Sequence, residues 1–175
     1  MTEREIQLAI ISEIRSTIVC AAPNYTPSGW WECDLWAVTK AGYTVEYEIK
    51  LTASDFRADA KKANNGWSYE EGRLIRRPAV TKHQAIEQSE KRPSRFFYVM
   101  PSDLANELES EIPEWAGLGK AQCDGHYRRV FFTKSAPKLN HNRASVREIR
   151  LCQRRMWYRY WEALRSIEDL KSRVK

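Results

Sequence analysis

The chain has 175 residues, of which 42% are hydrophobic and 30% charged, with seven glycines and seven prolines. This composition is typical of one globular domain spanning residues 1–175, and it excludes a disordered chain or a repeat array. No apolar stretch reaches the ~20 residues that span a bilayer, and the first residues are charged instead of forming a signal sequence. We therefore expect a cytoplasmic protein with no membrane partner.

Charge and cysteine usage narrow the choice of partners. The 29 basic and 23 acidic residues give a net charge of +6, which favours an anionic partner without identifying one. The cysteines are scattered, as is usual for reduced thiols in a core: Cys20, Cys33, Cys123 and Cys152. A zinc site built on Cys123 and His126 is an alternative, although the sequence offers no further ligands nearby.

The first half of the chain predicts a helix followed by a β-hairpin. Isoleucines at every fourth position favour an amphipathic helix over residues 3–19, and a loop over 23–29 closes it. Two strands are predicted over 30–38 and 43–51. The turn at 40–42 ends in a glycine that suits the left-handed position of a three-residue hairpin, so these strands should be antiparallel.

A second helix and a basic loop should follow. Thr52 is a candidate N-cap for a helix over 52–62, with Asp55 three residues further on. Residues 64–82 lose all periodicity and gather several arginines, which is typical of a basic surface loop.

The rest of the chain predicts three strands and a long helix. The aromatic run 95–100 is a strong strand candidate, and 115–122 and 127–133 are weaker ones. Ser145 and Glu148 form a capping box for the last helix. The order of elements indicates an α/β fold with a mixed central β-sheet flanked by helices and a long C-terminal helix.

The register of the predicted hairpin brings two acidic residues together. If Thr39 pairs with Tyr43, Asp34 lies opposite Glu48 on the same face. Opposed side chains are ~5 Å apart at Cβ, a separation at which two carboxylates can share a divalent cation. The cation also removes the repulsion that would otherwise raise their pKa values.

Lys50 lies two residues beyond Glu48 and therefore on the same face of the strand. An ammonium group there can orient a metal-bound water and stabilise charge on a phosphorus centre. Asp34, Glu48 and Lys50 thus suit metal-assisted phosphodiester hydrolysis. The alternative is an ordinary half-exposed strand, because alternating charged and apolar residues are typical of one.

Other motifs add less. Glu13 lies at the edge of the isoleucine stripe, where it can approach a metal ion or simply reach water. The histidines His83, His126 and His141 lack metal-ligand spacing, and no P-loop, dinucleotide fingerprint or nucleophile elbow occurs. The arginines and aromatics of the last helix fit a solvated face, a packing surface or a platform that stacks on unpaired bases.

The residues resemble a known family. The order helix, hairpin, helix, strand, with Asp34 on one hairpin strand and Glu-Ile-Lys at 48–50 on the other, resembles the PD-(D/E)XK nuclease superfamily, although Cys33 stands where its motif has proline. The segments YEIK at 47–50 and DFRADAKK at 55–62 resemble the MmcB-like DNA-repair nucleases. The segments RFFYVMP and IPEWAGL further along the chain support this similarity.

The resemblance implies a restriction-endonuclease-like core and a function. Asp34, Glu48 and the main-chain carbonyl of Ile49 would bind Mg²⁺, with Mn²⁺ as a substitute, and Lys50 would be the catalytic lysine. Glu13 would match the acidic residue that many members supply from their first helix. The expected activity is hydrolysis of DNA with weak sequence specificity or structure selectivity. The residues expected to contact the DNA backbone are Arg57, Lys61, Lys62, Arg73, Arg76 and Arg77.

Two rival functions remain open from sequence. The first is a nucleic-acid-binding module that keeps the nuclease scaffold without catalysis and uses the arginine-rich last helix. The second is an interaction protein whose exposed tryptophans contact a partner. The sequence does not reveal the oligomeric state, and the resemblance makes a homodimer one candidate, since dimers are frequent among relatives that cut both strands.

Overall fold

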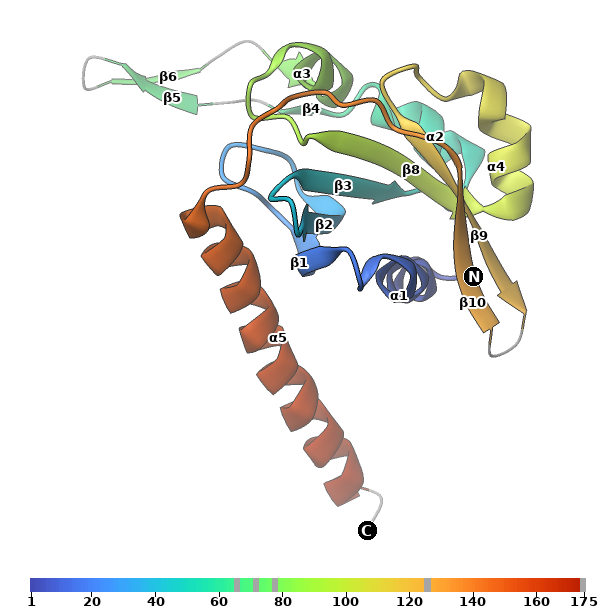
Figure 1. Cartoon of the computed structure of the whole chain (residues 1–175). Coiled ribbons are helices and arrows are strands. Elements are labelled where there is room, and N and C mark those ends of the chain that lie inside the picture. The colour runs from blue at the N-terminus through green and yellow to red at the C-terminus, as the bar shows by residue number, and fades with distance from the viewer. Residues whose placement is uncertain (65–66, 71–72, 77–78, 125–126, 174–175) are drawn as a thin grey trace.

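A computed structural model describes residues 1–64, 67–70, 73–76, 79–124 and 127–173. The fold is α/β, as the sequence predicts, with a six-stranded mixed sheet flanked by helices (Figure 1). No helix in these ranges is both long and apolar enough to cross a membrane.

The sheet has the strand order β1-β2-β3-β8-β9-β10. Its antiparallel pairs are β1 with β2, β2 with β3 and β9 with β10, whereas β8 runs parallel to both β3 and β9. The strand bounds are β1 Ile18–Tyr25, β2 Cys33–Thr39, β3 Thr44–Ile49, β8 Arg95–Pro101, β9 Gly117–Asp124 and β10 Tyr127–Lys134.

Helices cover both faces of the sheet (Figure 1). Their bounds are α1 Glu3–Ile14, α2 Ala53–Asp59, α3 Lys82–Gln88, α4 Ser102–Leu108, a 3-10 turn at Glu109–Glu111 and α5 Val146–Arg173. One core cluster joins α1 to Leu35, Tyr47 and Val99, and the other contains Trp36 and Tyr98. All six residues of β3 are buried, so its two glutamates lie inside the protein.

The chain leaves its first helix earlier than predicted. The first helix ends at Ile14, whereas the prediction extended it to residue 19. Residues 18–25 form β1, so the predicted end of the helix and the first part of the predicted loop are both wrong. Thr17 breaks the helix, because both its amide and its hydroxyl donate to the carbonyl of Ile14 at 2.8 Å. Pro23 is tolerated in β1 because this strand is at the edge of the sheet.

The segment predicted as a basic loop is more regular than expected. It contains the short strands β4 Ala63–Asn64, β5 Trp67–Glu70, β6 Arg73–Arg76 and β7 Val80–Thr81. β5 and β6 form an antiparallel hairpin that extends from the body (Figure 1), and β4 pairs with β7. The sequence analysis also missed α3 and α4, because each has only seven residues and therefore little periodicity.

Candidate active site on the β2–β3 hairpin

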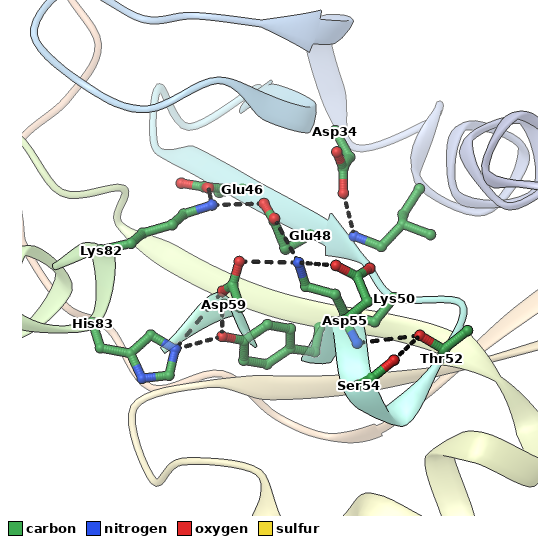
Figure 2. Close-up of polar contacts among 12 residues, drawn as sticks. Asp34, Glu46, Glu48, Lys50, Thr52, Ser54, Asp55, Asp59, Lys82 and His83 are labelled. Atoms are coloured by element: carbon green, nitrogen blue, oxygen red, sulfur yellow. Dashed lines mark hydrogen bonds and ion pairs between the residues drawn. The ribbon is translucent and has the colours of Figure 1, made fainter. Parts of the chain in front are cut away.

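The predicted hairpin register is confirmed. Trp36 pairs with Glu46, and the amide of Thr39 donates to the carbonyl of Tyr43 at 2.8 Å. Carried two residues further, this register sets Asp34 opposite Glu48. The glutamates of β3 lie on the face that bears Trp36, and Figure 2 shows them turned toward the ammonium groups of Lys82 and Lys50.

Asp34 is held at the open end of the hairpin. Its Oδ2 atom accepts a hydrogen bond from the amide of Ile49 at 2.6 Å, and Gln7 of α1 donates to its main-chain carbonyl at 2.9 Å. Burial, and then repulsion from Glu48, raise the pKa of Asp34 to about 7. A carboxyl group in this setting gains from a nearby cation, because a cation favours its ionised form.

Lys50 bridges the end of β3 to α2. Its Nζ atom lies 3.0 Å from Glu48 and 2.9 Å from Asp59 (Figure 2), and 3.8 Å from Asp55. Although burial lowers the pKa of Lys50, Glu48 and Asp59 raise it by more, so this side chain stays protonated. The structure thus brings Asp34, Glu48 and Lys50 together, as the sequence predicts.

Lys82 is a member of the site that the sequence analysis missed. This fully buried lysine begins α3, and its Nζ atom lies 2.8 Å from Glu46 and 2.6 Å from Glu48. The indole of Trp30 donates to the other oxygen of Glu46 at 2.7 Å. Burial lowers the pKa of Lys82, but Glu46 and then Glu48 raise it above its ordinary range. Two glutamates on a fully buried strand need a cation nearby. The pair of glutamates on a predicted strand was therefore the signal in the sequence that pointed to a buried lysine.

Asp59 and two rings complete the cluster. The hydroxyl of Tyr98 donates to Asp59 at 2.9 Å, and the Nε2 atom of His83 lies 2.8 Å from that hydroxyl (Figure 2). Burial raises the pKa of Asp59, but the His83 ring, whose Nε2 atom lies 3.7 Å from its carboxylate, and the charges of Lys82 and Lys50 lower this pKa by more. The Asp59 carboxylate therefore remains ionised and anchors Lys50.

Carboxyl groups outnumber ammonium groups in the cluster. Asp34, Glu46, Glu48 and Asp59 surround Lys50 and Lys82 (Figure 2), and burial raises the pKa values of Asp34 and Glu46. A divalent cation would favour the ionised form of these two groups. Within the described ranges no three His, Cys, Asp or Glu side chains are arranged to hold a metal ion. Magnesium needs only one or two carboxylates when carbonyl oxygens, water and substrate phosphate complete its shell. Asp34 and Glu48 with the Ile49 carbonyl fit that requirement.

The members of the cluster differ in their access to solvent. Glu48 and Lys50 are 2% and 4% exposed, whereas the side chain of Asp55 is 55% exposed and Asp34 is partly exposed. The ammonium group of Lys50 therefore lies just below a surface that Asp34 and Asp55 share.

Glu13 is not part of this site, which corrects the prediction. It is exposed and lines a surface depression with Ser12 and residues 127–129. The acidic residue that α1 does contribute is Glu3. Glu3 accepts a hydrogen bond from Gln7 at 2.9 Å, and its charge raises the pKa of Asp34. A helix of 12 residues spans ~18 Å, so its two ends cannot both reach one metal site.

The predicted DNA-contacting residues are dispersed. Arg57 is engaged by Glu111 through hydrogen bonds of 3.0 and 2.6 Å, and Lys61 and Lys62 are exposed after α2. Arg73 and Arg76 begin and end β6 in the extended hairpin. Arg77 lies outside the described residues, as does His126 of the alternative zinc site.

Comparisons with known proteins identify one structure with a similar fold, and they do not bear on the chemistry of the site. No protein-family model and no curated protein matches the chain. Among solved structures, a protein of unknown function from Silicibacter pomeroyi is similar, with a TM-score of 0.58 and 15% sequence identity. The alignment covers 98% of this chain and 94% of that protein. At this identity the similarity concerns the fold alone.

Proposed function

We propose that the protein is a magnesium-dependent nuclease of the PD-(D/E)XK type that hydrolyses phosphodiester bonds of DNA. The observation that carries the proposal is the hairpin register, which joins Asp34 to the Ile49 amide while Glu48 and Lys50 meet at 3.0 Å on the adjacent strand. The order α1, β2–β3 hairpin, α2, β8 is the order on which the family resemblance rests.

Each residue has a distinct task in this proposal. Asp34 and Glu48 would hold Mg²⁺, and the ion, when bound, would polarise the phosphate and acidify a water. Lys50 cannot act as a base at neutral pH, because its neighbours raise its pKa. Its ammonium group instead orients the attacking water and stabilises the charge that develops on the phosphate oxygens.

Lys82 is an internal counter-ion in this scheme. It neutralises part of the Glu46 and Glu48 charge, which keeps the two glutamates in place on a buried strand. A carboxylate has about four lone-pair directions. Glu48 can therefore keep its two lysine contacts and still offer an oxygen lone pair to a metal ion.

The rival function is nucleic-acid binding without catalysis. One observation favours it: both oxygens of Glu48 are already within hydrogen-bond distance of an ammonium group, Lys50 on one side and Lys82 on the other. If these contacts excluded a metal ion, the site would be only a structural ion network. Metal-dependent cleavage separates the two functions.

The deciding experiment measures cleavage of labelled single-stranded, duplex and branched DNA in Mg²⁺ or Mn²⁺. We expect the unaltered protein to produce metal-dependent products. Asp34→Asn and Lys50→Met should each reduce the rate by about 10²–10³-fold, with DNA affinity changed only a few-fold. Glu107→Gln removes an exposed carboxylate on α4 and is the matched control. Absence of metal-stimulated cleavage on all three substrates would leave the binding module as the function.

A further inference from the structure

The C-terminal helix exposes an apolar stripe that nothing in the described protein covers. Trp157, Tyr160 and Trp161 are 58%, 58% and 52% exposed, and Leu164 and Ile167 are 38% and 48% exposed. We name these five residues the α5 stripe. A single exposed leucine is unremarkable, but a contiguous row of large apolar side chains marks an interaction site.

The α5 stripe lies to one side of, and beyond, the part of the helix that contacts the body. The opposite side of the helix faces α1, where Arg155, Glu162 and Ser166 line a depression with Arg4, and Arg159 donates to the carbonyl of Asn24 at 3.2 Å. At about 100° per residue, Arg159 lies roughly 140° around the helix from Leu164. The side of the helix that contacts the body also carries apolar residues: Cys152 is fully buried, and Met156 lines an apolar depression with residues of α1 and β1. The α5 stripe lies beside these contacts or beyond them along the helix, so its apolar side chains remain in solvent.

The spacing of the stripe is that of paired helices. Trp157, Tyr160, Leu164 and Ile167 follow one another at intervals of three, four and three residues. This alternation keeps a narrow apolar seam on one side of a helix, as the packing of two helices requires.

The charges beside the stripe match a second copy in the antiparallel orientation. Arg154 and Glu168 lie on the same edge, seven residues before and after Trp161. When two copies pack antiparallel about Trp161, Arg154 of each faces Glu168 of the other. Parallel packing places these two edges on opposite sides of the pair and gives no such match.

We propose that two copies of this chain form a symmetric dimer through antiparallel packing of the α5 stripe. A full aromatic side chain buries roughly 200 Å², so the exposed parts of the stripe amount to several hundred Å² per chain. Doubled by symmetry, this area approaches the lower range of stable interfaces, ~1,200 Å².

The test is sedimentation of the full chain over a range of micromolar concentrations. The unaltered protein should sediment at twice its mass of 20.5 kDa. Leu164→Glu should weaken association by at least about 100-fold, because the pair would bury two carboxylates. Leu151→Glu is the matched control, since Leu151 is 40% exposed on another side of α5. That variant should remain dimeric.

The orientation is tested by charge reversal. Arg154→Glu and Glu168→Arg should each weaken the dimer by about two- to fivefold, and the double variant should recover the original affinity. An unaltered protein that stays monomeric would overturn the proposal, as would equal effects of the two leucine substitutions. A monomer whose affinity for labelled duplex DNA falls with Leu164→Glu alone would also overturn it, because the stripe would then bind nucleic acid. Failure of the double variant to recover would exclude the antiparallel pairing.

Discussion

The hairpin site and the C-terminal helix place charge and apolar surface in opposite ways. The site buries Glu46, Glu48 and Lys82 in the centre of a strand face, whereas α5 leaves Trp157 and Tyr160 in solvent. Buried charges are stabilised because their counter-ions belong to the same chain, but the α5 stripe has no such partner in the described ranges. The site is therefore largely self-contained, and the helix indicates contact with another molecule.

The largest effect should come from breaking the buried network at Lys82. Lys82→Met leaves Glu46 and Glu48 without their shared cation, which should lower the free energy of unfolding by about 3–5 kcal/mol. Urea denaturation measures this loss. Lys61→Met removes an exposed lysine and should change stability by no more than about 0.5 kcal/mol. Equal stability of the two variants would contradict the counter-ion role of Lys82.

The next effect concerns Asp34 and pH. Its pKa is about 7 in the folded protein against an ordinary value of 3.8. The folded state therefore binds the proton more tightly, and the stability from protonated Asp34 is complete below pH 3.8 and is lost as pH rises through about 7. In metal-free buffer Asp34→Asn should exceed the unaltered protein in stability by on the order of 2–3 kcal/mol at pH 8.

Thermal unfolding at several pH values checks this prediction and extends it to the metal. Added Mg²⁺ should raise the unfolding temperature of the unaltered protein at pH 8 and have little effect on Asp34→Asn, because the ion binds only the folded state. If Asp34→Asn lost stability in parallel with the unaltered protein between pH 4 and pH 7, another group would control the transition.

The smallest effect should be seen on α5. Leu151→Gln replaces a large apolar residue by a polar one, yet we expect a change within about 0.5 kcal/mol because Leu151 is exposed on the surface of α5. Comparison with Lys82→Met sharpens the contrast between the buried site and the exposed helix. Loss of the buried charge should lower the free energy of unfolding far more than loss of the surface leucine. A loss above about 2 kcal/mol would show that Leu151 packs in the core.

Much of the local structure was predictable from sequence. Thr52 caps α2 by accepting from the amide of Asp55 at 3.1 Å, and Ser145 and Glu148 form the predicted capping box. The hairpin register followed from a three-residue turn because side chains alternate across a strand with a period of two. These features depend on residues close together in the chain, so short-range geometry was enough to predict Asp34 opposite Glu48.

Long-range contacts were beyond such reasoning. Lys82 looked like one more basic loop residue, and Asp59 carried no signal, because 34 and 9 residues separate them from their partners Glu48 and Lys50. Glu13 was placed wrongly for the same reason: periodicity gives a side chain's angle around a helix but not which end of the helix approaches the sheet.

The sequence by itself determined the α/β class, the hairpin register and the amphipathic character of the last helix. Only the tertiary structure decided which lysine neutralises Glu46 and Glu48, and which face of α5 turns outward. The physical reason is that hydrogen bonds within helices and turns follow from neighbouring residues, whereas the pairing of buried charges depends on how distant segments pack around them.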